Sequence, residues 1–164
     1  MTRRFAEIIR GFPQPEADAL GEREAQYLAR ADTFYLATVN EAGWPYVQHR
    51  GGPKGFLRVL SQTRLGYADF GGNRQYLSAG NAARNDRASI LVMDYAARRR
   101  LKLLGYLRFI AVSEADPALV RAVELPGYAA RVERVALLDV AAFDWNCPQH
   151  ITPRFTLEEL QALG

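Results

Sequence analysis

The segment of residues 71–75, with the sequence GGNRQ, combines residue types that bind phosphate. It follows a predicted strand that ends at Phe70, and its two glycines let a ligand approach the main chain closely. Asn73 can cap a helix that starts there. The amides at a helix start and the planar fork of Arg74 both suit phosphate oxygens. The alternative interpretation is a Gly-Gly turn leading into an ordinary capped helix.

Basic residues also gather at Arg98, Arg99, Arg100 and Lys102, between two predicted strands. Arg98 and Arg99 fit a solvated charged turn. Arg100 and Lys102 have the same strand parity, so they share one face of a sheet. Such a pair of cations can serve a phosphate or an electron-rich ring.

A third polar cluster, Gln48-His49-Arg50, ends the second predicted strand. His49 has the chemistry of a catalytic acid or base. The sequence places no carboxylate or nucleophile beside it, so a hydrogen-bonding role is the simpler interpretation. We assign no catalytic residue.

The segment from Trp145 to His150, WNCPQH, allows several interpretations. Cys147 and His150 have a metal-like spacing, but zinc sites need three or four protein ligands and only His49 is left to add. We therefore expect no metal. A Cys–His nucleophilic pair is a second interpretation, and a polar aromatic tail packed on the barrel is a third. In a fourth, Trp145 covers a flat cofactor.

The hydrophobic pattern predicts a first helix followed mainly by short strands. The predicted helices are Pro15–Ala31, Asn73–Asn81 and Pro117–Glu124, and the predicted strands are Thr33–Val39, Trp44–His49, Phe56–Leu60, Leu65–Phe70, Ala88–Tyr95, Leu101–Val112 and Val132–Phe143. Gly105 marks a bend in the longest strand, and Asp116 or Ser113 caps the last of these helices. The expected fold is mainly β: a closed or partly closed antiparallel barrel with short connecting helices.

Composition sets outer bounds on organisation and location. We expect one domain of 164 residues, with an N-terminal extension over 1–14 and an irregular tail over 144–164 that ends in a short helix from Leu157. A net charge of +3 favours local anion sites over a nucleic-acid surface. The single cysteine, the charged N-terminus and the lack of a long apolar run predict a cytoplasmic protein with no membrane segment.

Four segments in order carry a family resemblance: Phe34–Val39 with Gly43-Trp44-Pro45, then Gly72-Asn73-Arg74-Gln75, then Asn85–Val92, then Arg100–Gly105. With them the chain resembles the FMN-binding split-barrel family related to pyridoxamine 5'-phosphate oxidase, from about Tyr27 to Ile110. Each motif is weak alone, and their order and spacing make the case.

The resemblance implies a homodimer with FMN at the subunit interface. It implies that the phosphate motif consists of Gly72, Asn73, Arg74 and Gln75. It also implies that the phosphate and the ring are reached by Gln48, His49 and Arg50, and that Arg100 and Lys102 approach the ring from the partner chain. Finally, it implies that Trp145, Gln149 and His150 lie near the cofactor. The flavin would supply the redox chemistry.

The chain also departs from the vitamin B6 oxidases. They end in an Arg- and His-bearing segment that grips the substrate, whereas this chain finishes with Leu157-Glu158-Glu159-Leu160 and has Gln75 where the family has Lys. We therefore expect an FMN-dependent oxidoreductase with another small-molecule redox substrate. The alternative is a non-catalytic protein that holds FMN, haem or a deazaflavin.

Overall fold

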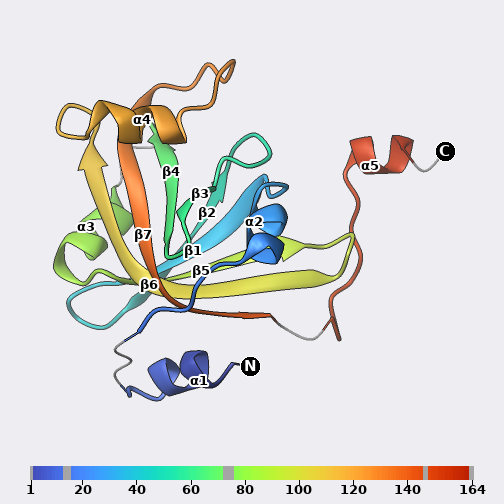
Figure 1. The fold of residues 1–164 in the computed structure, drawn as a ribbon, viewed down its shortest axis with the longest axis horizontal. Helices are drawn as coiled ribbons and strands as arrows, with labels where there is room; N and C mark the ends of the chain where they lie inside the picture. The colour runs from blue at the N-terminus through green and yellow to red at the C-terminus, as the bar shows by residue number, and fades with distance from the viewer. Residues whose placement is uncertain (1, 13–15, 72–75, 146–147, 163–164) are drawn as a thin grey trace.

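A single antiparallel sheet of seven strands curls into a barrel that stays open on one side (Figure 1). The computed structural model describes residues 2–12, 16–71, 76–145 and 148–162. The strands are β1 (Thr33–Val39), β2 (Pro45–Gly51), β3 (Arg58–Ser61), β4 (Arg64–Phe70), β5 (Arg87–Asp94), β6 (Arg99–Ala111) and β7 (Val132–Trp145). Their order is β2-β1-β5-β6-β7-β4-β3, so β2 and β3 are the edges. The prediction of a mainly β split barrel is confirmed.

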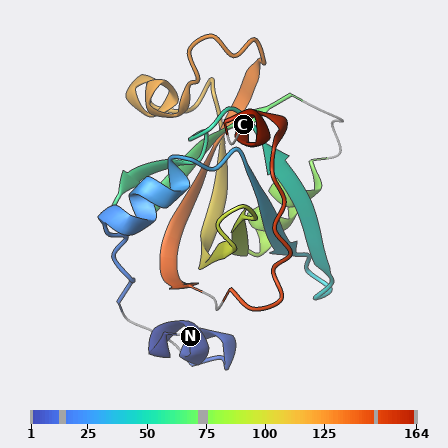
Figure 2. The ribbon, with the colours of Figure 1, turned by 90° about the vertical axis from the view of Figure 1, so that its right-hand side faces the viewer.

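Short helices surround the barrel and occupy both ends of the chain. They are α1 (Arg3–Ile9), α2 (Glu22–Leu28), α3 (Leu77–Arg84), α4 (Pro117–Val123) and α5 (Leu157–Gln161). In Figures 1 and 2, α1 lies at one side of the barrel, where Phe5 is buried and Thr2 bonds to Asp144 of β7, and α5 ends a C-terminal segment that runs along the outside of the barrel. Within the described ranges, no helix has the length and apolar character needed to cross a bilayer.

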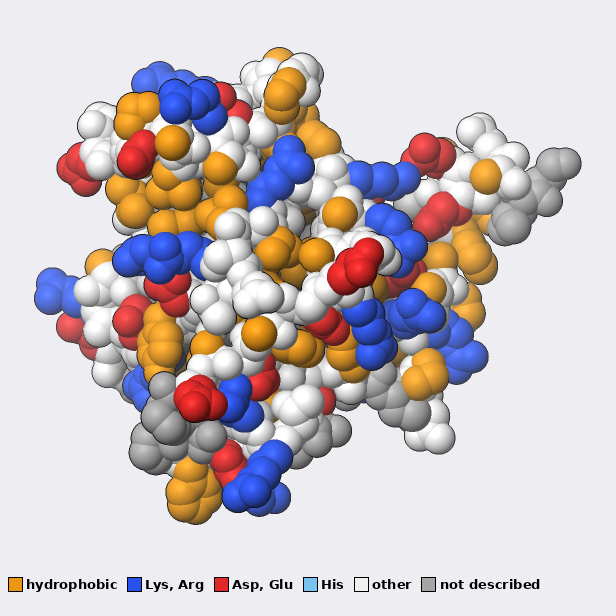
Figure 3. Space-filling model, in the orientation of Figure 1, with side chains coloured by type: hydrophobic (Ala, Val, Ile, Leu, Met, Phe, Trp, Pro, Cys, Tyr) orange, Lys and Arg blue, Asp and Glu red, His pale blue; other side chains and the backbone are white. Residues whose placement is uncertain are grey.

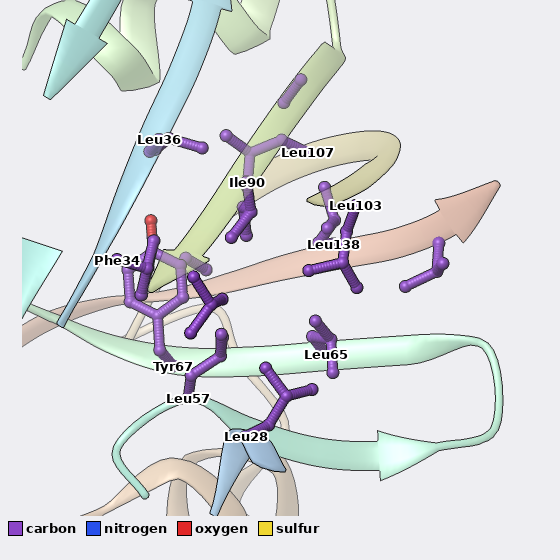
Figure 4. Close-up of a cluster of buried hydrophobic side chains, with 14 of the residues drawn as sticks. Leu28, Phe34, Leu36, Leu57, Leu65, Tyr67, Ile90, Leu103, Leu107 and Leu138 are labelled. Carbon is purple, nitrogen blue, oxygen red and sulfur yellow. The ribbon is translucent and has the colours of Figure 1, made fainter. Parts of the chain in front are cut away.

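The core fills the barrel because alternate residues of each strand point inward (Figure 4). In β1 these are Phe34 and Leu36, both fully buried. The Phe34 ring lies 5.3 Å from Phe56 and 5.2 Å from Tyr67 of β4. β1 and β4 are not neighbours in the sheet, so these aromatic contacts hold the open barrel together across its interior.

A second apolar cluster covers the outer face of β4 and β7. There α4 buries Val123 against Val135 and Leu137. The helix begins at Pro117, and the Asp116 carboxylate accepts a hydrogen bond of 2.7 Å from the N–H of Ala118. The predicted Asp116 cap is confirmed.

Several predicted boundaries were wrong because tertiary contacts override local pattern. Of the helix predicted over residues 15–31, only α2 is helical, since the N–H groups of Asp18 and Leu20 bond to Ala141 and Gln62 carbonyls. The helix predicted from Asn73 begins at Leu77, after Tyr76 takes a left-handed φ of 50°. The last strand continues to 145, β3 begins at 58, and the N-terminal extension contains α1, which was not predicted.

Replacing Gly105 tests the bend predicted in β6. The ladder to β7 shifts register between Leu104 and Gly105, and a Cβ on Gly105 would clash with the backbone carbonyl oxygen of Asp139. Gly105→Ala should therefore lower the free energy of unfolding by about 2 kcal/mol or more. Gly80→Ala, in α3 with open space around its Cβ, should raise it by about 0.5–1 kcal/mol. Urea unfolding that ranks the variants in the opposite order would contradict this account.

Candidate anion-binding site at the barrel mouth

A buried carboxylate at the end of β4 holds two arginines from different strands. Asp69 is only 1% exposed. Its Oδ1 lies 2.6 Å from Nη1 of Arg50 in β2. Its Oδ2 accepts from Nη2 and Nε of Arg134 in β7, at 2.6 and 2.9 Å. These three side chains, which we call the barrel-mouth cluster, join both sides of the open barrel.

Strand alternation brings these residues to the interior. Asp69 follows the buried Leu65 and Tyr67 at every second position of β4, and Arg134 precedes Ala136 and Leu138 in the same way on β7. Arg50 pairs across the sheet with Phe34 of the core. The cluster therefore forms the polar end of the hydrophobic interior.

The barrel-mouth cluster has an excess of positive charge and unused donors. Two guanidinium groups share one carboxylate, and Nε of Arg50 is buried with no hydrogen-bond partner among the described residues. The Tyr67 hydroxyl is also buried and unpartnered there. Burial raises the pKa of the Tyr67 hydroxyl. The negative charge of Asp69 raises this pKa further and the positive charge of Arg50 lowers it, and the hydroxyl stays protonated. Unsatisfied buried donors beside excess cations suit an anion with several acceptor oxygens.

Tyr76 covers this cluster from the loop side. Arg134 lies 4.4 Å from the centre of the Tyr76 ring and 5.3 Å from that of Phe109. The Tyr76 hydroxyl donates to Glu133 at 3.1 Å. The predicted phosphate residues Gly72, Asn73, Arg74 and Gln75 lie outside the described residues, in the stretch between Gly71 at the end of β4 and Tyr76.

The residues Gln48, His49 and Arg50 do not share one face of β2. Gln48 and Arg50 point inward, and Gln48 Oε1 accepts a hydrogen bond of 3.1 Å from Ser78 of α3. His49 points outward, where its Nε2 contacts the Thr33 hydroxyl and its ring lies 5.9 Å from that of Tyr35. Among the described residues, no carboxylate contacts His49.

Arg100 and Lys102 lie on the same outer face as His49. The register places His49, Tyr35, Leu91 and Lys102 in one row across β2, β1, β5 and β6. Three strand spacings, about 14 Å, separate the ends of that row, so His49 and Lys102 cannot hold one small group within a subunit.

The two cations of this pair differ in their contacts. Lys102 Nζ lies 3.2 Å from Asp144 Oδ2 and 4.6 Å from the centre of the Phe5 ring of α1. Burial opposes ionisation of Asp144, yet the Thr2 N–H and Lys102 hold its pKa below the usual value. Lys102 therefore anchors α1, whereas Nε of Arg100 is buried with no partner among the described residues.

The predicted tail residues lie apart from the barrel mouth. The Trp145 indole N–H donates to Glu24 Oε1 at 2.7 Å, and its ring meets Tyr27 of α2 edge-on at 4.7 Å. Gln149 and His150 are exposed. Among the residues with assigned positions, no three His, Cys, Asp or Glu side chains lie close enough to hold a metal ion.

Tyr67, Asp69 and Arg134 were not given a functional role from the sequence. A usable signal was present, because a charged residue at an inward position of a strand has to be paired. Asp69 and Arg134 both take such positions within otherwise apolar alternation. Their mutual distance comes only from the β4–β7 register, in which they pair directly.

Neutralising Asp69 tests how much the barrel-mouth cluster contributes to the stability of the fold. Asp69→Asn leaves two largely buried guanidinium groups without a counter-charge and should cost about 2–4 kcal/mol of unfolding free energy. Asp139→Asn is the control, because the Asp139 carboxylate is 37% exposed and its pairs with Arg64 and Arg108 lie near the surface. That change should cost less than about 1 kcal/mol. Equal losses in urea unfolding would show that the cluster has no special role.

Comparison with known proteins places the chain in a family. No curated protein matches it. HupZ of Group A Streptococcus aligns with a TM-score of 0.62 at 14% identity, covering 83% of this chain and 100% of that one. A pyridoxamine 5'-phosphate oxidase-related, FMN-binding protein of Nostoc punctiforme has a TM-score of 0.55 at 17% identity, with 88% and 84% covered.

An FMN-binding protein of Syntrophomonas wolfei has a TM-score of 0.50 at 14% identity, with 77% and 88% covered. At these identities the likeness shows the fold alone. The family model of pyridoxamine 5'-phosphate oxidase matches residues 20–142, from just before α2 almost to the end of β7. The chain therefore belongs to the pyridoxamine 5'-phosphate oxidase family.

Proposed function

We propose that the protein binds FMN, with the phosphate at the barrel mouth, and acts as an oxidoreductase on a small molecule other than vitamin B6. The observation that carries the proposal is the barrel-mouth cluster, where Arg50 and Arg134 share one carboxylate and keep a net positive charge. Two structural neighbours are named as FMN-binding proteins, which supports the same cofactor.

The residues present suit the two ends of FMN. Arg50, Arg134 and the Tyr67 hydroxyl supply donors for a dianionic phosphate, and we propose Arg74 and the glycine-rich segment as further contacts to it. Asp69 orients both guanidinium groups from beneath. The flavin supplies electron transfer when bound. Gln48 and His49 remain proposed contacts to it. Trp145, Gln149 and His150, which lie apart from the barrel mouth of their own subunit, are proposed to contact the flavin of the partner subunit.

A second copy of the chain completes the proposed site. The outer face of β1, β2, β5 and β6 carries half-buried or exposed apolar residues, including Val47, Leu91 and Met93, and β2 is an open edge. Covering this face with a partner buries them. Arg100, whose Nε has no partner in the described part of the chain, then approaches the ring of the partner's flavin more readily than Lys102, which is held by Asp144.

Replacing Arg74 tests the phosphate assignment. Arg74→Ala should weaken FMN binding at least tenfold, since a charge-assisted phosphate contact contributes about 1.5–3 kcal/mol. Riboflavin, which lacks the phosphate, should bind both proteins equally. Arg121→Ala, an exposed arginine of α4, serves as the control. Flavin fluorescence titrations in which Arg74→Ala and Arg121→Ala bind FMN alike would refute the assignment.

The oligomeric state has its own expected outcome. Light scattering at micromolar concentration should give the mass of a dimer, and Val47→Asp on the outer face of β2 should shift it towards monomer. Glu41→Asp, in the exposed β1–β2 turn, should leave it unchanged. A stable wild-type monomer with bound flavin would overturn the shared site.

Turnover separates an enzyme from a carrier. Because no dinucleotide fingerprint is present in the sequence, a nicotinamide would act as a transient reductant. The flavin-loaded protein should oxidise NADH or NADPH with multiple turnovers when an artificial acceptor is supplied. Reduction that stops at one equivalent, or none, would favour the alternative of a non-catalytic flavin-binding protein.

A further inference from the structure

A cavity that contains none of the barrel-mouth residues lies beside the entry to β1. It has a volume of about 550 Å³ and is bounded by the entry to β1, the tip of the β5–β6 hairpin and the C-terminal segment. This volume falls within the range of small-molecule sites, roughly 300–1,000 Å³. None of Arg50, Asp69 and Arg134 lines it. The cavity is thus distinct from the proposed phosphate site.

The C-terminal segment forms one wall of this cavity and is held to the rest of the chain by three contacts. Arg98 at the hairpin tip donates to the carbonyl of Pro148 at 3.2 Å. Arg154 stacks over the Tyr95 ring at 4.9 Å. Lys54 pairs with Glu158 at 2.8 Å. In Figure 2 this segment passes along the outside of the barrel, and in Figure 3 Lys and Arg side chains gather around the hairpin tip.

Two arginines at this cavity lack an acidic partner. Arg30 follows α2 and Arg154 lies on the C-terminal segment, and within the described ranges neither forms an ion pair. The third cation, Lys54, already has Glu158, with Asp32 and Glu159 nearby, and these acids raise its pKa. Arg30 and Arg154 are therefore the charges available to a ligand.

Two of the acids lining the cavity are already used by the backbone. Asp94 Oδ1 accepts from the N–H of Ala97 at 2.8 Å and closes the hairpin turn. Glu159 accepts from the N–H and hydroxyl of Thr156 in the α5 capping box, and these bonds lower its pKa. Asp32 remains, on the side of the cavity where Lys54 lies. These hydrogen bonds leave both carboxylates charged, so the three acids of the lining balance its three cations, and Arg30 and Arg154 are the two cations with no direct acidic partner among the described residues.

The other walls are apolar or aromatic. Val92 and Met93 of β5, Tyr95 and the 48%-exposed Phe155 line the cavity. Aromatic walls favour a planar ring, and arginine forks favour a carboxylate with two oxygens in one plane. The two features together select a small aromatic acid.

We propose that this cavity binds a small aromatic carboxylate, with Arg30 and Arg154 on the carboxylate and Tyr95 and Phe155 against the ring. None of Arg30, Arg154, Tyr95 and Phe155 is among the residues proposed to contact the flavin, although Met93 of the cavity also belongs to the face proposed for the partner subunit. Binding also fixes the C-terminal segment against the hairpin, because one wall of the site belongs to that segment.

The test uses 2-naphthoate as the probe and uncharged 2-naphthamide as its isostere, with the full-length protein saturated with FMN and also without flavin. By fluorescence titration, wild type should bind naphthoate about tenfold more tightly than naphthamide. Arg30→Ala and Arg154→Ala should each weaken naphthoate binding about three- to tenfold. The expected loss is modest because both arginines are exposed to solvent, which weakens their ion pairs with the carboxylate. Naphthamide affinity should stay unchanged.

Arg121→Ala on α4 is the matched control and should bind naphthoate like wild type. The proposal fails if naphthoate and naphthamide bind equally, or if Arg30→Ala and Arg154→Ala behave like this control. It also fails if FMN displaces naphthoate, since the cavity would then belong to the flavin site. Loss of FMN binding in all proteins, with naphthoate binding intact, would reject the flavin proposal and leave this one standing.

Discussion

The ion pairs of Asp69 with Arg50 and Arg134 are the constraint on which the candidate site depends. β2 lies at one edge of the sheet and β4 near the other, so their ends meet only across the interior of the open barrel. One buried carboxylate joins them there and brings β7 into the same cluster. Removing a single partner from such a cluster leaves a buried charge without its counter-charge, which strongly destabilises the fold. The same cluster supplies the positive charge on which the proposed phosphate site depends.

The two faces of the sheet then take different roles. Inward positions hold the aromatic core of Phe34, Phe56 and Tyr67, and the barrel-mouth cluster lies at the end of that core. Outward positions hold His49 and Arg100 on a face with half-buried apolar neighbours. Because β2 is an edge strand, a ligand at its end can reach both faces. For this reason Gln48, His49 and Arg50 can all be proposed as contacts to the flavin, although their side chains point to alternate faces of β2.

Much of the fold could be predicted because local patterns and tertiary contacts agree. β1 was predicted with its observed limits, and the Gly105 bulge and the Asp116 cap followed from residue type. The helix starts could not be predicted where long-range backbone hydrogen bonds decide, as for residues 16–21. At the site, Arg50 was selected from its motif, but its Asp69 partner depends on barrel closure, and the tethering of Lys102 and Trp145 to α1 and α2 depends on packing. These long-range contacts leave no mark in sequence spacing.

The absorption spectrum of the purified protein, followed by release and identification of its pigment, tests the central claim most directly. The account predicts flavin bands near those of free FMN and one FMN released for each barrel-mouth cluster, with none retained by a doubly substituted Arg50→Ala, Arg74→Ala protein that still folds. A colourless protein that ignores added FMN, or one that releases haem or a deazaflavin instead, would contradict it.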